Sequence, residues 1–242
     1  MHKPAIKALF FDVFGTLVDW RESIAREARQ ILTPFVPEQA SEIDWHAFAD
    51  AWRAKYQPAM EEVRSGRLPF GKLDGLHRRN LDRVLADLHL HQVDEEARCD
   101  LNLAWHRLDA WPDVAGGLAR LRQRFWIAPC SNGNISLMAG IARRNGLYWD
   151  AILGAEPARD YKPKPEVYRY AAAAFDLAPE QTMMVAAHST DLAAAAAAGL
   201  RTAFIARPDE YGPGLGESAP AVDVELEAQD LDELALLLGC VA

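Results

Sequence analysis

A carboxylate directly follows an apolar run near the start of the chain. Residues 6–11 are largely apolar and lead to Asp12, and Gly15 and Thr16 turn the chain just beyond it. An uninterrupted apolar run is typical of a strand buried in a parallel sheet. The carboxyl ends of such strands are where α/β proteins place their chemistry, so Asp12 could act as a nucleophile. The alternative is that Asp12 only caps the turn that follows.

Three later segments place polar side chains after an apolar run or in a loop before a helix. They are residues 125–134, 160–168 and 182–191, with Ser131, Asn132, Lys162, His188 and Asp191 as their polar side chains of interest. A nucleophilic Asp, a hydroxyl, a Lys and a final acid, in this order and each after a strand, resemble the four motifs of the haloacid dehalogenase superfamily. The resemblance covers essentially the whole chain, and the order and spacing make it specific.

Two departures from the phosphatases of that superfamily are informative. Phosphatase members carry Asp-x-Asp-x-Thr, whose second Asp is a general acid and base, and this chain has Phe14 there. Where they place a magnesium-binding Asp in the last motif, this chain has Ala187. Magnesium prefers oxygen ligands, so phosphoryl transfer is disfavoured and no metal or other cofactor is expected. An aromatic side chain at position 14 suits a carbon–halogen bond, and the motif resembles the L-2-haloacid dehalogenase branch.

The resemblance implies catalytic roles for the matching residues. Asp12 would displace halide and form an ester that water then hydrolyses, which splits one hard step into two easier ones. Lys162 would keep Asp12 ionised, since a nearby cation lowers the pKa of a carboxylate. The alternative for Lys162 is a solvated loop lysine, as Lys164 more simply is. Thr16 is expected to orient Asp12.

The resemblance also implies residues that bind the substrate. Arg53 in the helical region and Asn132 would donate to the leaving halide, and Ser131 would hold the substrate carboxylate. The remaining expected members of the pocket are Phe14, Thr16, Phe70 and Tyr168. Without the resemblance, the default for Arg53 is a surface role.

The fourth motif departs from the dehalogenase pattern. Well-matched members carry Ser and Asn where this chain has Ala186 and His188, while the acid is kept as Asp191. A histidine titrates near neutrality and can take a proton from water. His188 could therefore be the base for ester hydrolysis, or Asp191 could be that base with His188 only hydrogen-bonded nearby. Both alternatives stay open.

The elements that must position these side chains alternate along the second half of the chain. Strand-like runs at 125–130, 151–154, 182–187 and 201–206 alternate with helix-like segments at 113–123, 134–145, 165–175 and 191–198. Such alternation predicts a doubly wound parallel α/β sheet.

A long helical region separates the first strand from the next core strand. Segments around 23–33, 45–63, 72–88 and 95–108 have helix-like apolar spacing, and a crossover needs far fewer residues. The surplus predicts a helical cap over residues 21–110, inserted into a core of residues 1–20 and 111–242. The dehalogenase branch carries such a cap.

Composition sets further bounds. The chain has 242 residues, a net charge of −9 and 50% hydrophobic residues, enough for one α/β core with an insertion. The negative charge argues against nucleic-acid binding. There is no apolar run long enough for a membrane span and no signal-like start. Three cysteines without a close pair indicate neither a zinc site nor a disulfide framework, so we expect a cytoplasmic protein.

These observations together favour a metal-independent hydrolase that removes halide from short 2-haloalkanoic acids. The partner is then a small-molecule 2-haloacid, with a homodimer allowed for. The first alternative is a phosphatase or phosphonate hydrolase of the same superfamily. The second is a catalytically idle protein that keeps the fold and an anion site.

Overall fold

A six-stranded sheet forms the centre of the molecule. The computed structural model describes residues 4–38 and 40–240, so the ends of the predicted core range, residues 1–3 and 241–242, lie outside the described residues. The strands, in their order across the sheet, are β5 (Leu153–Gly154), β4 (Trp126–Ser131), β1 (Ala8–Phe11), β6 (Thr182–Ala186), β7 (Arg201–Ile205) and β8 (Leu226–Ala228). All neighbouring pairs are parallel. This confirms the predicted doubly wound parallel sheet.

Strand β1 is central because both of its faces are apolar. Leu9 and Phe11 pack into one hydrophobic cluster, while Ala8 and Phe10 pack into another on the opposite face. Successive side chains of a strand point to opposite faces, so an uninterrupted apolar run serves both. The first cluster includes residues of the core helices α6 (Val114–Leu121), α7 (Ile135–Asn145) and α11 (Leu231–Leu237), and it continues into the helical region after β1. The helices of the second are α9 (Pro165–Ala173) and α10 (Ser189–Ala197).

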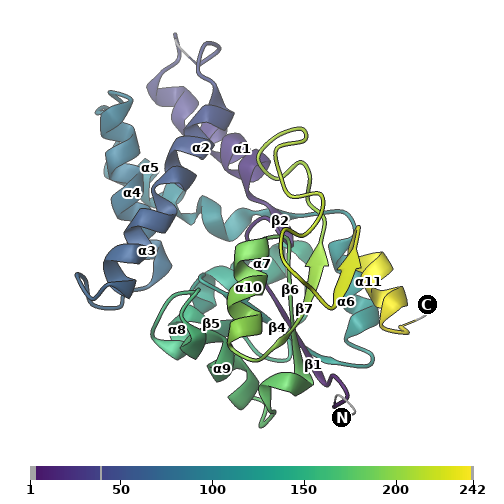
Figure 1. Cartoon of the computed structure of the whole chain (residues 1–242). Helices are drawn as coiled ribbons and strands as arrows, with labels where there is room; N and C mark the ends of the chain where they lie inside the picture. The colour runs from purple at the N-terminus through teal and green to yellow at the C-terminus, as the bar shows by residue number, and fades with distance from the viewer. Residues whose placement is uncertain (1–3, 39, 241–242) are drawn as a thin grey trace.

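The region between the first two core strands is helical. It contains α1 (Trp20–Leu32), α2 (Trp45–Ala54), α3 (Tyr56–Arg64), α4 (Leu73–Asp87) and α5 (Glu95–Asn102), with the 3-10 helices η1 (Thr33–Phe35) and η2 (Leu103–Arg107). The short antiparallel pair β2 (Val18–Asp19) and β3 (Asp109–Ala110) joins both ends of this region. Figure 1 shows α1–α5 gathered beyond the carboxyl ends of the strands. None of the described helices is long and apolar enough to cross a membrane.

One predicted helix is two helices in the structure. The segment expected at 45–63 ends as α2 at Ala54 and resumes as α3 at Tyr56, with Lys55 between them. Pro58 supplies the physical reason: in a continuous helix its ring would clash with the carbonyl of Ala54, four residues earlier. The segment expected at 95–108 likewise ends at Asn102 and continues as η2.

Several short elements carry too little signal for sequence analysis. Strand β8 has three residues and β2 and β3 have two each, so none shows a period. Helix α11 is seven residues long. The remaining elements are α8 (Ala155–Ala158), which follows β5, and η3 (Pro179–Gln181), which leads into β6.

Candidate active site

The carboxyl ends of β1, β4 and β6 bring the sequence motifs together. Phe11 is in register with Pro129 on β4 and with Val185 on β6. The backbone N–H of Asp12 still donates to the carbonyl of Val185, at 3.0 Å. Asp12 is thereby fixed at the sheet edge just where β1 stops, and the residues that follow β4 and β6 lie on either side of it.

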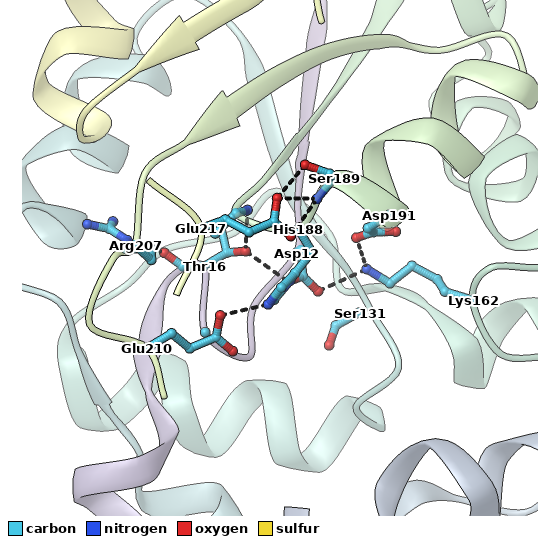
Figure 2. A network of polar contacts seen from close by, with 12 residues as sticks. Asp12, Thr16, Ser131, Lys162, His188, Ser189, Asp191, Arg207, Glu210 and Glu217 are labelled. Atoms are coloured by element: carbon cyan, nitrogen blue, oxygen red, sulfur yellow. Dashed lines mark hydrogen bonds and ion pairs between the residues drawn. The ribbon is translucent and has the colours of Figure 1, made fainter. Parts of the chain in front are cut away.

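The two oxygens of the Asp12 carboxylate have different partners, as Figure 2 shows. Oδ1 accepts from Nζ of Lys162 at 2.9 Å, whereas Oδ2 accepts from the Thr16 hydroxyl at 2.8 Å and lies 3.1 Å from Nδ1 of His188. Asp12 is buried. Burial alone would raise its pKa, but the Lys162 ammonium and His188 hold the pKa well below its usual range. Asp12 is therefore an anion at neutral pH.

Lys162 bridges two carboxylates. Its Nζ lies 2.5 Å from Oδ2 of Asp191 in addition to its contact with Asp12. The Tyr168 hydroxyl donates to the other oxygen of Asp191. The side-chain oxygen of Asn132 accepts the backbone N–H of Lys162 at 2.8 Å, which anchors this loop. Burial alone would lower the pKa of Lys162, but Asp12 and Asp191 raise it above its usual value.

His188 lies between two carboxylates. Its Nδ1 faces Asp12, and its Nε2 lies 2.8 Å from Oε2 of Glu210. The other oxygen of Glu210 accepts the indole N–H of Trp20 at 3.0 Å, and Glu210 is 2% exposed. Burial alone would lower the pKa of His188, but the hydrogen bonds to Asp12 and Glu210 raise it to about 10.

A cavity of about 450 Å³ opens onto these groups. Cationic or protonatable side chains outnumber carboxylates in its lining, which suits an anionic ligand. Its lining residues are Asp12, Phe14, Arg53, Tyr56, Gln57, Arg64, Asn132, Lys162, Pro163, Tyr168, His188, Thr190, Asp191 and Tyr211.

Arg53 reaches this cavity from the helical region, at the end of α2. Its guanidinium lies 4.2 Å from the ring centroid of Tyr56 and 5.7 Å from that of Phe14. Its Nη1 is buried with no hydrogen-bond partner among the described residues. A buried guanidinium N–H without an acceptor is costly, so an anion bound here would satisfy it.

Phe14 belongs to an aromatic cluster behind the cavity. Its ring makes edge contacts with Tyr56, His77 and Trp105. Both ring nitrogens of His77 lack partners in the part of the chain described here, and burial lowers its pKa to about 3. The His77 ring is therefore neutral and packs edge-on against Phe14, so this side of the cavity carries no charge from His77.

Three of the expected site residues lie outside the described cavity lining. Thr16 is fully buried and reaches Asp12 directly. Ser131 is fully buried too, and its hydroxyl accepts the backbone N–H of Gly133 at 3.1 Å. The ring of Phe70 packs at a tilt against that of Tyr161, with ring centroids 5.3 Å apart. Cys130, beside Ser131, has its pKa raised to about 12 by burial, so its thiol stays protonated.

Residues of this region that were not assigned from the sequence include Trp20, Tyr56, Arg64, Glu210 and Tyr211. Only Tyr56 carried a usable signal, since it lies three residues after Arg53 and so about one helical turn away. Arg64 donates to the carbonyl of Lys162 at 2.8 Å. Glu210 lies in a loop after β7 and belongs to no motif, so the sequence gave no reason to place it beside His188.

The donor set around Asp12 is a poor match for a resident metal ion. Lys162, Thr16 and His188 occupy its oxygens, and the neighbouring positions 14 and 187 are apolar. Across the described residues, no group of three or more His, Cys, Asp or Glu side chains is arranged to hold a metal ion.

The fold and this site define a known class of hydrolase. A family model described as a haloacid dehalogenase-like hydrolase matches residues 6–199. The chain belongs to this family, which confirms the resemblance drawn from its motifs.

Similar proteins point to one branch of the family. The crystal structure of the L-2-haloacid dehalogenase PA0810 is 42% identical, with a TM-score of 0.88, over 97% of this chain and 100% of that chain. That of the defluorinating L-2-haloacid dehalogenase Rha0230 is 41% identical, also with a TM-score of 0.88, over 97% and 95%. (S)-2-haloacid dehalogenase 1 of Pseudomonas sp. strain CBS-3 is 29% identical over 223 residues, 85% of this chain and 88% of its own.

Proposed function

We propose that this chain hydrolyses the carbon–halogen bond of short 2-haloalkanoic acids to give 2-hydroxy acids. One observation carries the proposal: a buried, ionised Asp12 faces a cavity that also holds a guanidinium without a hydrogen-bond partner among the described residues. The names of the similar proteins support the same chemistry. With Phe14 where a phosphatase carries its second Asp, the cavity has an apolar wall in place of a proton donor.

In the first step, Asp12 displaces the halide. Oδ1 is the attacking oxygen, because it has one donor among the described residues while Oδ2 has two. Its lone pair forms the new bond to C2 from the side opposite the halogen, so the configuration at C2 inverts. The halide leaves with the bonding electron pair. Arg53 stabilises that developing charge, as preorganised donors do in a site shielded from water.

Asn132 adds a second donor to the same pocket. Its side-chain oxygen is already used by the backbone N–H of Lys162. Its NH₂ group has two hydrogens, so one can donate to a bound anion while the other faces the Tyr56 hydroxyl. Tyr168 acts through Asp191, to which its hydroxyl donates. Phe70 would line the pocket only if the cap moves, since its ring now packs against that of Tyr161.

In the second step, water attacks Cγ of the Asp12 ester. The product leaves with the oxygen that Asp12 supplied, and the water oxygen stays on Asp12. The sum is one haloacid and one water converted to one hydroxy acid, one halide and one proton. We further propose that residues 21–110 act as a cap over this cavity, since Arg53, Tyr56 and Arg64 reach it from α2 and α3. A cytoplasmic location and a homodimer remain our expectations.

Halide release from 2-fluoro, 2-chloro and 2-bromo acids, measured with and without EDTA, tests the function. We expect release of halide with at least one of these acids, at a rate that EDTA leaves unchanged. Phosphate release from phosphate monoesters that requires Mg²⁺, with no halide release, would instead identify a phosphatase. Failure to act on either class would favour an idle anion-binding protein.

A further inference from the structure

A buried carboxylate that no motif accounts for lies behind His188. Glu210 comes from the loop after β7 and is held by His188 on one oxygen and by the Trp20 indole on the other. Figure 2 shows that His188 connects Glu210 to Asp12, with one ring nitrogen facing each carboxylate. The Glu210 carboxylate packs against the backbone of Gly15, where a side chain would not fit: a Cβ on Gly15 would lie 2.1 Å from Oε1 of Glu210. The turn after β1 thus leaves room for this carboxylate.

The two neighbours of the His188 ring determine its protonation state. A neutral imidazole has one N–H donor and one bare nitrogen. With carboxylate oxygens at 3.1 Å from Nδ1 and 2.8 Å from Nε2, a neutral ring would direct a lone pair at one of the two anions. When both carboxylates are ionised, only the doubly protonated ring satisfies both contacts.

We propose that Glu210 is a positioning residue that keeps His188 doubly protonated, so that His188 and Thr16 donate to Oδ2 of Asp12 during ester hydrolysis. This inference rests on the proposed function. When Oδ1 carries the alkyl group, Oδ2 is the carbonyl oxygen of the ester. Attack of water on Cγ moves the carbonyl electron pair onto Oδ2, and two donors already point at that atom.

Thr16 is prepared for the same task. Its hydroxyl oxygen accepts the backbone N–H of Ala187 at 2.9 Å, which leaves the hydroxyl hydrogen for Oδ2 of Asp12 at 2.8 Å. Thr16 and His188 thus form a two-donor oxyanion site anchored on β1 and β6. Preorganised donors of this kind act in the transition state without reorganising.

The assignment removes His188 as the base and leaves Asp191. Water gives one proton to Asp191 as its oxygen bonds to Cγ. The intermediate then collapses: the Cγ–Oδ1 bond breaks, the carbonyl re-forms at Oδ2, and the leaving alkoxide takes the proton from Asp191. Asp12 is left as a carboxylic acid, whose proton is lost to solvent.

The pH dependence of hydrolysis distinguishes a donor from a base. The groups that surround the ring are Asp12 and Glu210 on its nitrogens, with Lys162, Asp191, Arg53 and Tyr211 in the same cavity. In the free protein the His188 pKa is raised to about 10. Esterification removes the charge of Asp12 but not that of Glu210, which continues to favour the protonated ring.

Single-turnover measurements with a 2-chloro acid follow the two steps separately, as the halide burst and as decay of the Asp12 ester seen by mass spectrometry. We expect the rate of ester decay to be level from about pH 6 to 8 and to fall as the pH rises further, because the imidazolium is then lost. A rate of ester decay that instead falls as pH drops through about 6.5 would make His188 the base and overturn the inference.

Nitrogen-15 NMR of His188 in the free protein at pH 8 tests the protonation state without any substrate. Both ring nitrogens should be protonated, with the signal assigned by its loss in His188→Asn. One bare nitrogen at pH 8 would refute the assignment. If no halide burst appears at all, the proposed function fails while this test of Glu210 and His188 still stands.

Glu210→Gln is the direct variant. It should slow ester decay at pH 8 by about 100-fold, the order seen on loss of an oxyanion donor, and move the alkaline fall toward neutral pH. The halide burst should stay within about threefold of that of the unaltered protein, and ester should accumulate.

The control is Glu217→Gln, on the same loop. The Glu217 carboxylate contacts Ser189 and not His188, so this variant should leave the midpoint of the pH profile unchanged. An unchanged midpoint in Glu210→Gln would overturn the role of Glu210. The experiments on unaltered protein decide the matter if this variant does not fold.

Discussion

Asp12 combines two tasks on one carboxylate. Its Oδ1 faces the Lys162 ammonium and its Oδ2 has two donors. A symmetric environment would leave both oxygens equally able to attack. The unequal contacts suit Oδ1 to attack the substrate and Oδ2 to receive negative charge during hydrolysis of the ester.

Asp12→Asn should abolish halide release while the protein stays folded, because an amide is a far weaker nucleophile than a carboxylate. The matched control is Asp223→Asn on the exposed surface, which should keep full activity. In unaltered protein, a single turnover in ¹⁸O-labelled water should place the label on Asp12 and not on the product. Label found directly in the product hydroxyl would mean that water attacks the substrate itself.

Arg53→Ala should slow halide release far more for a fluorinated acid than for a brominated one. Fluoride is the poorer leaving group and depends most on donors to its developing charge, so we expect a loss of about 100-fold or more for fluoride and about tenfold for bromide. Rapid-quench measurement of the burst gives both values. Arg83→Ala, an exposed arginine of α4, is the control. Equal losses for the two halogens would place Arg53 outside the halide site.

At the scale of elements, the turn after β1 connects the nucleophile to the residues behind it. Gly15 has φ +85° and its carbonyl accepts the Trp111 indole N–H at 2.8 Å. The next residue's carbonyl accepts from the buried Arg207 at 2.8 Å, and Arg207 also contacts Asp113. This turn is therefore held by two separate segments, one after β3 and one after β7.

Gly15→Ala should destabilise the protein much more than Gly66→Ala does. Both glycines have positive φ, +85° and +75°, but a Cβ at Gly66 meets nothing within 4 Å, whereas at Gly15 it meets the Glu210 carboxylate. We expect Gly66→Ala to cost about 1–2 kcal/mol from backbone strain. Gly15→Ala should cost about 1–3 kcal/mol more from overpacking. Urea unfolding measures both, and equal losses would show that the Glu210 side chain moves aside freely.

At the scale of the whole molecule, distant parts of the chain meet as a buried network of charges. Asp12, Lys162, His188, Asp191 and Glu210 come from segments that are up to nearly 200 residues apart in sequence. Buried charges are costly unless they are paired. The network is therefore stable only as a complete set, and its contribution to the free energy of unfolding depends on pH.

The stabilising contribution of His188 should be greatest below about pH 6.5 and decline as the pH rises toward 10. Its pKa in the folded protein is raised to about 10 from the ordinary value of 6.5, so the folded state holds the proton more tightly. Asp12 has a lowered pKa and acts in the opposite sense, losing its contribution as the pH falls below about 4. Urea unfolding of the unaltered protein and of His188→Asn at pH 6, 8 and 10 should show a difference that shrinks with rising pH. A difference that grows would contradict the pairing.

Much of the fold followed from the sequence because its signals are local. The apolar runs at 6–11, 125–130 and 182–187 predicted β1, β4 and β6, and their order predicted a doubly wound sheet. Elements of two or three residues, such as β2 and β8, carry no period and could not be predicted. The break at Lys55 had a local cause in Pro58, which the apolar spacing of the segment concealed.

The sequence by itself determined the chemical inventory: an acid after the first strand, a lysine before a helix, an acid after the β6 strand, and no second acid at position 14. Tertiary structure alone decided the protonation states of these groups. Glu210 reaches His188 from a loop 22 residues away, and the Trp20 indole donates to the other oxygen of Glu210. The protonation of a histidine depends on the carboxylates packed around it, and no pattern along the chain records which loop will supply them.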